Sequence, residues 1–217
     1  SASVFFFLMI RPPPSSTLFP SPPLFRSGGL PGFFVTGSLY RPTTRGSGPF
    51  PAVLSPHGHD THGRFTVYSE ERGRERIALG QEEHLPNSRR KHQSRCVQLC
   101  RMGCVVFHYD MIGYADSTQL DHRRGFGDVE AELWGMSHFG LQTLDSIRAL
   151  DFLISLPDVD PKRVAVTGAS GGGTQTFILG AVDDRPDVLF PAVMVSTHMQ
   201  GGCFCANPSA LPRGSGQ

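Results

Sequence analysis

The sequence predicts an α/β fold with a doubly wound, mostly parallel β-sheet. Short apolar runs, of the kind that a parallel sheet buries on both faces, recur along the chain. They are expected as strands at Ala52–Leu54, 104–110, Arg163–Val166 and about Ala192–Val195. Segments with helical periodicity lie between these runs, and strands that alternate with helices are typical of a parallel sheet with crossover helices on its faces.

The first 27 residues, SASVFFFLMIRPPPSSTLFPSPPLFRS, predict no regular element. They contain six prolines and have neither helical periodicity nor strand alternation. The apolar run Val4–Ile10 is not typical of a signal peptide, because no basic residue precedes it and Arg11 follows it directly. We therefore expect residues 1–27 to be a non-native or disordered segment, and residues 28–217 to form one domain.

The next part of the chain predicts two strands and a polar excursion. FFVTGSLYRP, residues 33–42, indicates an outer strand that ends at a proline. Ala52–Leu54 is a short buried strand, which a loop rich in histidine and glycine follows. Residues 60–95 suggest several short helices but show no sustained apolar face, so we expect them to lie on the surface.

The remaining elements alternate between helix and strand. Cys96–Met102 is typical of the end of a helix stopped by Gly103, and the strand CVVFHYD follows. Apolar residues from Leu141 to Ile154 repeat at helical spacing until Pro157 ends the helix. After the strand at Arg163–Val166, GGGTQTFILGAVD indicates another helix, which precedes the last apolar run.

Composition limits the possible partners. A formal net charge of +1 gives no electrostatic argument for binding nucleic acid or an anionic membrane, and we expect neither partner. The chain has no apolar run of membrane-spanning length. Its five cysteines, an odd number at spacings that suggest no disulfide scaffold, leave a cytoplasmic and a secreted location both open, and the oligomeric state is equally open.

The motif with the clearest chemical meaning is Gly168-Ala169-Ser170-Gly171-Gly172. It matches the pattern G-x-S-x-G between a predicted strand and a predicted helix, which is the context that a nucleophile turn requires. Gly168 and Gly172 would allow the tight turn, and Ser170 would be held over the end of the sheet. The alternative is a glycine-rich strand-to-helix turn that binds a phosphate or nothing.

A second motif follows the Ala52–Leu54 strand. Acyl transfer needs two donors for the oxyanion; the N–H of Gly171 would be one, and the N–H of His59 in SPHGHD is our candidate for the other. The competing interpretation is a metal site formed by His57, His59 and His62. Their spacing, without a cysteine or carboxylate at a typical ligand distance, argues against it, and we expect no metal and no cofactor.

Four segments, SPHGHD, GCVVFHYDMIGYADS, DPKRVAVTGASGGGTQT and MVSTHMQGGCFCAN, resemble the α/β-hydrolase superfamily. Within it they are similar to the bacterial esterases related to acetyl xylan esterases and dienelactone hydrolases. The resemblance implies that residues 28–217 are the N-terminal portion of a catalytic domain whose sheet is incomplete at its C-terminal end. It also implies a serine that attacks an ester carbonyl, a histidine that activates the serine, and an aspartate that orients the histidine.

The other two members of such a triad are difficult to assign. In this fold the acid and the histidine follow the serine, but His198 is the only histidine after Ser170. Asp183, Asp184 or Asp187 could serve as the acid, although we expect both groups to lie beyond Gln217. A chain without them should be inactive. Residues 8–27 also resemble the translation of a sequencing-library adapter, which fits a truncated sequence.

The sequence thus predicts a serine esterase that acts on acylated carbohydrate or another small-molecule ester through an acyl-enzyme. One alternative is a serine peptidase of the prolyl oligopeptidase type, which shares the fold and the nucleophile turn. The other is a non-catalytic binding module, although such a protein would not need a strained serine.

Overall fold

The computed structural model describes residues 6–9, 33–42, 48–124, 131 and 133–195. In this part of the chain one six-stranded sheet has the order β1-β2-β4-β3-β5-β6. The strands are β1 (Phe6–Met9), β2 (Thr36–Tyr40), β3 (Phe50–Leu54), β4 (Val105–Tyr109), β5 (Val159–Ala169) and β6 (Val188–Ala192). β1 and β2 are antiparallel to their neighbours, whereas β4, β3, β5 and β6 run parallel. The predicted mostly parallel sheet is confirmed.

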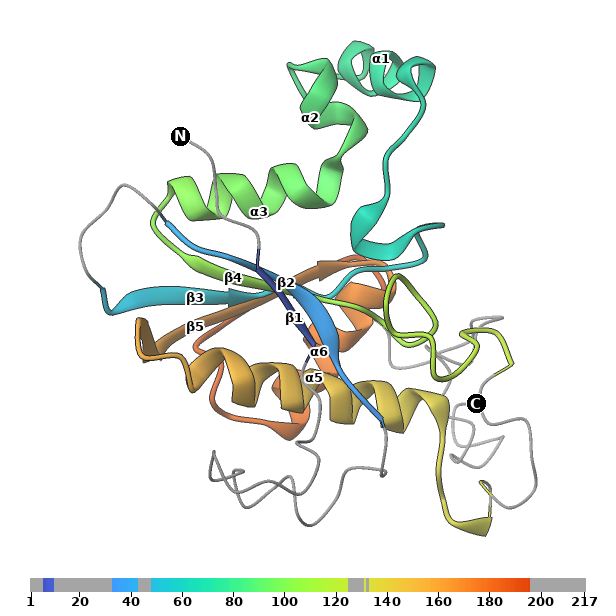
Figure 1. Cartoon of the computed structure of the whole chain (residues 1–217), viewed down its shortest axis with the longest axis vertical. Helices are drawn as coiled ribbons and strands as arrows, with labels where there is room; N and C mark the ends of the chain where they lie inside the picture. Colours follow the sequence, from blue (N-terminus) through green and yellow to red (C-terminus); the bar gives the residue numbers. More distant parts are fainter. Residues whose placement is uncertain (1–5, 10–32, 43–47, 125–130, 132, 196–217) are drawn as a thin grey trace.

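Helices cover both faces of the sheet (Figure 1). α3 (Lys91–Arg101) lies on one face, while α5 (His138–Ile154) and α6 (Gly171–Val182) lie on the other. The short helices α1 (Glu70–Ala78) and α2 (Leu85–Arg89) precede α3 and lie beyond it, away from the sheet. The sheet is therefore doubly wound, as predicted.

The alternating side chains of the central strands form two apolar cores. On the side of α5 and α6, Leu54 and Phe107 pack with Leu150 of α5 and Leu179 of α6. On the other side, a smaller cluster joins the strands to α3 and consists of Tyr40, Val53, Cys96, Cys100 and Val106. Every residue of β4 is buried, which explains why apolar side chains occupy both faces of this strand instead of alternating with polar ones.

Two strands differ most from their predicted bounds. β5 begins four residues before the predicted Arg163, because Phe50 of β3 pairs with Val159 before a register shift. β6 lies earlier than predicted, at Val188–Ala192 instead of about Ala192–Val195, since Ala165 of β5 is aligned with Val188. The apolar run from Val188 to Val195 has no polar residue that would fix its register from sequence alone.

The N-terminal segment also departs from expectation, since no element was predicted in residues 1–27. Phe6–Met9 nevertheless forms β1 and pairs with β2, so β2 is not at the edge of the described sheet. The interpretation of residues 1–27 as a non-native or disordered segment stays a prediction.

The polar excursion at residues 60–95 is only partly a surface feature, which corrects the sequence-based expectation. Arg64, Ser88 and His92 are buried. The buried positions are polar, so a search for an apolar stripe cannot detect them. Among the described residues, no helix is long and apolar enough to span a membrane.

Candidate functional site

Ser170 occupies the turn between the end of β5 and the start of α6. Its backbone has φ +57° and ψ −122°, a conformation that costs a residue other than glycine about 1–3 kcal/mol. Its N–H donates to the carbonyl of Ala192 at 3.1 Å, and its carbonyl accepts from the N–H of Thr174 at 3.0 Å. These bonds fix the turn to the end of β6 and to the first turn of α6.

The glycines of the motif have little space around them. A Cβ atom at Gly168 would lie 2.5 Å from the carbonyl oxygen of Pro56 and 2.6 Å from that of Gly172. A Cβ atom at Gly172 would also lie 2.5 Å from the oxygen of Pro56. Because these contacts are with backbone, any side chain would push the turn away from the loop that follows β3. The two glycines therefore let this turn and this loop touch.

The loop after β3, residues 55–60, is held in place from within. The ring of His57 donates from Nδ1 to the carbonyl of Gly58 at 2.8 Å, and its Nε2 accepts from the N–H of Met111 at 3.1 Å. Burial lowers the pKa of His57 to about 3, so its imidazole is neutral at ordinary pH. His57 therefore supports the loop, and both of its ring nitrogens are occupied by backbone groups.

His59, our candidate second oxyanion donor, lines the same pocket as Ser170. Its side chain is engaged elsewhere, because its Nε2 lies 2.9 Å from Nε2 of His122. Nδ1 of His122 donates to the carbonyl of Ile112 at 2.7 Å, so Nε2 of His122 is the acceptor in the pair. The imidazole of His59 is thus fixed, and the oxyanion role of its N–H stays a prediction, as does that of Gly171.

The competing metal interpretation of His57, His59 and His62 finds no geometric support. The rings of His57 and His59 bond to different partners, and His62 is exposed. Across the described residues, no three histidine, cysteine or acidic side chains are arranged to hold a metal ion.

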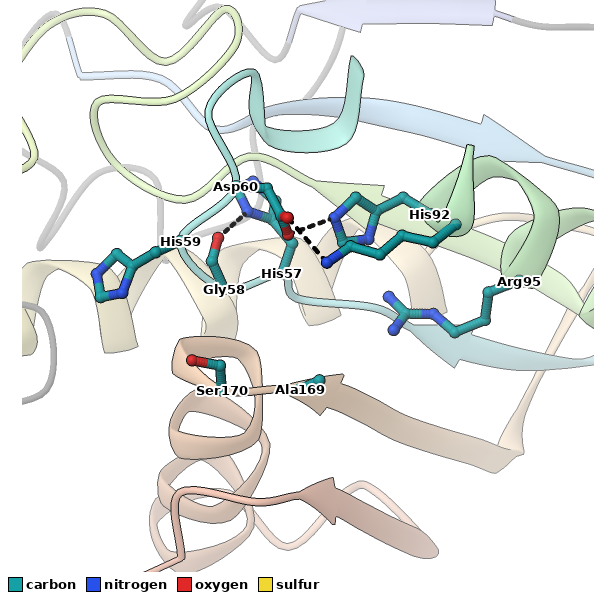
Figure 2. Close-up of a pocket in the computed structure, with 9 residues that line it drawn as sticks. His57, Gly58, His59, Asp60, His92, Arg95, Ala169 and Ser170 are labelled. Atoms are coloured by element: carbon teal, nitrogen blue, oxygen red, sulfur yellow. Dashed lines mark hydrogen bonds and ion pairs between the residues drawn. The ribbon is translucent and has the colours of Figure 1, made fainter. Parts of the chain in front are cut away.

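A cavity of about 290 Å³ lies between the nucleophile turn and the loop after β3 (Figure 2). Its lining is His57, Gly58, His59, Asp60, Lys91, His92, Arg95, Ala169 and Ser170. The structure therefore brings the predicted Ser170 and His59 together. It also adds a wall from α3 that the sequence-based reasoning missed, because Lys91, His92 and Arg95 lie in the segment assigned to the surface.

Asp60 connects this wall to the loop. Its carboxylate accepts from Nε2 of His92 at 2.7 Å and from Nζ of Lys91 at 2.8 Å, and the hydroxyl of Tyr68 donates to it at 3.2 Å. Partial burial raises the pKa of Asp60, but the bonds from His92 and Lys91 outweigh it and hold the pKa well below its usual range. Burial lowers the pKa of His92, which keeps that ring neutral.

The aspartates that follow Ser170 are far from it. Asp183 is the residue after the last turn of α6, and a helix of twelve residues is about 18 Å long. Asp187 bonds to the N–H of Val164, at the end of β6 opposite to the one near Ser170. Neither residue can orient a catalytic histidine at Ser170. His198 lies outside the described residues, and no histidine within them accepts a hydrogen bond from Ser170 Oγ.

Comparisons with known proteins fit this geometry. Residues 102–199 match the family model of acetyl xylan esterases (AXE1). The computed structure aligns with that of methylesterase BT1017 at a TM-score of 0.57 and 30% identity, over 82% of this chain and 33% of that one. The chain has the α/β-hydrolase fold, and its residues 102–199 are similar to acetyl xylan esterases.

Two further proteins are similar to this chain. YtaP of Bacillus subtilis (strain 168), which is described as a hydrolase, is 32% identical over 142 residues, covering 64% of this chain and 41% of that protein. An acetyl xylan esterase from Paenibacillus sp. R4 aligns at a TM-score of 0.51 and 22% identity, over 74% of this chain and 44% of that one, which supports the α/β-hydrolase fold. The chain thus spans less than half the length of each of these relatives.

Proposed function

We propose that this α/β-hydrolase chain carries the nucleophile of a serine hydrolase that cleaves carboxylic esters, with acylated carbohydrate or another small ester as substrate. The observation that supports the proposal most directly is the strained backbone of Ser170 at the mouth of a cavity. Such strain is costly and is typical of functional sites. The match to acetyl xylan esterases supports the ester as the bond that is cleaved.

The proposed reaction begins when Ser170 Oγ attacks the ester carbonyl. The hydroxyl proton passes to a base, and the carbonyl becomes a tetrahedral oxyanion. When the oxyanion collapses, the C–O bond to the leaving group breaks, the base returns its proton to the leaving oxygen, the alcohol departs and an acyl-serine remains. The N–H of Gly171, at the first position of α6, would stabilise the oxyanion together with the N–H of His59. The positive end of the α6 dipole would act in the same direction. Water then hydrolyses the acyl-enzyme.

We also propose that this chain alone is nearly inactive. A serine hydroxyl is a weak nucleophile at neutral pH unless a neighbouring base accepts its proton. Among the described histidines, His57 has both ring nitrogens bonded to backbone, and His92 donates to Asp60. Neither is placed to activate Ser170.

A fluorophosphonate probe with mass spectrometry tests the nucleophile. We expect slow modification at Ser170, because oxyanion donors help even an unactivated serine at this turn. The adduct should be absent in Ser170→Ala and retained in Ser155→Ala, a control at an exposed serine after α5. Absence of an adduct, or adducts spread over surface serines, would contradict the nucleophile proposal.

Turnover of p-nitrophenyl acetate tests the proposed inactivity separately. We expect the purified chain to hydrolyse this ester at a rate close to that of buffer. Turnover that Ser170→Ala abolishes would overturn the proposed inactivity while supporting the role of Ser170.

A further inference from the structure

The wall of the cavity that faces the nucleophile turn is basic. α3 contributes Lys91 and Arg95, and Figure 2 shows the guanidinium of Arg95 between the loop after β3 and Ala169. Asp60 is the one carboxylate among the described lining residues, and Lys91 and His92 both bond to it. One of the two cations in the lining is therefore already paired.

Arg95 is the other cation of the lining. One of its terminal nitrogens donates to Oγ of Ser55 at 2.7 Å, whereas its buried Nε has no hydrogen-bond partner among the described residues. No described carboxylate forms an ion pair with Arg95. A buried donor that stays unpaired is unfavourable, and the cost is greater when the donor is charged.

The histidines of the cavity lining do not contribute to its net charge. Burial lowers the pKa of His57, His59 and His92, so all three are neutral at ordinary pH. The charged lining groups are then Lys91, Arg95 and Asp60, which together carry one positive charge. The charge lies in a partly buried cavity, where an ionic interaction is stronger than in bulk water.

We propose that Arg95 binds a carboxylate of the substrate, so that the esters accepted at Ser170 carry a negative charge close to the scissile bond. This inference rests on the proposed function and names its substrate class. A guanidinium is suited to this task, because its planar fork of N–H donors matches the two oxygens of a carboxylate. The bond from one terminal nitrogen to Ser55 orients the guanidinium, which lines the cavity beside Ser170.

The test compares two esters of nearly equal size, monomethyl succinate, which is an anion, and methyl succinamate, its neutral amide. Binding to the Ser170→Ala chain is measured by titration calorimetry or by chemical-shift changes, so no turnover is needed. We expect the anion to bind at least about tenfold more tightly than the amide. Arg95→Gln should abolish this preference, and raised salt should weaken it.

Two further variants make the result interpretable. Arg101→Gln, at an exposed position on the same helix, should keep the preference. Arg95→Lys should keep part of it, because the charge remains but the fork is lost. It also serves as the test variant if Arg95→Gln does not fold. Equal affinity for the two esters, or a preference that survives the loss of Arg95, would overturn the inference.

The outcome is separable from that of the proposed function. If the fluorophosphonate modifies Ser170 but the two esters bind equally, the nucleophile proposal stands and the anion site is wrong. If the anion is preferred but Ser170 is never modified, the cavity binds carboxylates and the proposed catalytic function fails.

Discussion

Gly58 lies directly against Ser170. A Cβ atom at Gly58 would be 2.9 Å from Cβ of Ser170 and 2.9 Å from the carbonyl oxygen of Ala169. The loop after β3 and the turn after β5 are thus packed together at the carboxyl ends of two neighbouring parallel strands. This edge is where ligands bind in open α/β sheets. The contact therefore determines how the candidate oxyanion loop is placed relative to the candidate nucleophile.

Gly58→Ala should destabilise the chain by about 1–3 kcal/mol, as expected when extra volume is forced into a packed site. Gly171→Ala is a matched control at the same contact, because its Cβ would lie 3.6 Å from Cα of Gly58, at ordinary packing distance. Urea unfolding measures both variants. If Gly58→Ala were as stable as Gly171→Ala, the close contact would be wrong.

The strain at Ser170 predicts a stability difference between two variants that both remove the hydroxyl. Glycine adopts positive φ freely, whereas alanine retains the strain of serine. Ser170→Gly should therefore have a free energy of unfolding about 1 kcal/mol higher than Ser170→Ala. Thermal unfolding of the two proteins in the same buffer measures it. Equal stability would mean that the turn is not strained.

Much of the fold follows from local patterns in the sequence. The buried strands β3 and β4 and the helix α5 were predicted because continuous apolar runs and a helical stripe each have one clear structural meaning. The turn at Ser170 could also be predicted, since Gly168, Ser170 and Gly172 lie between a predicted strand and a predicted helix. The register of β6 could not be predicted, because its uniformly apolar residues allow more than one alignment with β5.

The α3 wall of the cavity could not be predicted. Its residues Lys91, His92 and Arg95 face inward, but polar residues in a polar segment are normally assigned to the surface. Their burial depends on Asp60 and Ser55, which are 32 and 40 residues away from His92 and Arg95 in sequence. Only the tertiary structure reveals that His92 bonds to Asp60 and Arg95 to Ser55.

The buried ion pair between Arg64 and Asp110 predicts a large effect of mutation. Both side chains are almost fully buried, Asp116 also pairs with Arg64, and Thr36 donates to Asp110 at 2.6 Å. Arg64→Met should cost about 3–5 kcal/mol, because it leaves the carboxylate of Asp110 without its cation. The exposed pair of Arg72 with Glu75 provides the control, and Arg72→Met should change stability little. Similar urea midpoints for the two variants would contradict a buried pair.

His138 predicts how stability depends on pH. Both of its ring nitrogens are buried and have no hydrogen-bond partner in the described part of the chain, and burial, with His122 nearby, lowers its pKa to about 4. In the unfolded chain the same ring titrates near its ordinary value of about 6.5. The unfolded state therefore binds more protons between about pH 6.5 and pH 4, and the free energy of unfolding falls as the pH falls through this window.

His138→Phe removes this titration and keeps an aromatic ring of similar size. The pH dependence of its unfolding free energy should be shallower than that of the unmodified chain by up to about 1.4 kcal/mol per pH unit within the window. Urea unfolding at pH 7, 6 and 5 measures the slopes.

Because the substitution also removes two unpaired buried nitrogens, His138→Phe should be at least as stable as the unmodified chain at pH 5. Equal slopes for His138→Phe and the unmodified chain would mean that His138 titrates normally in the folded state.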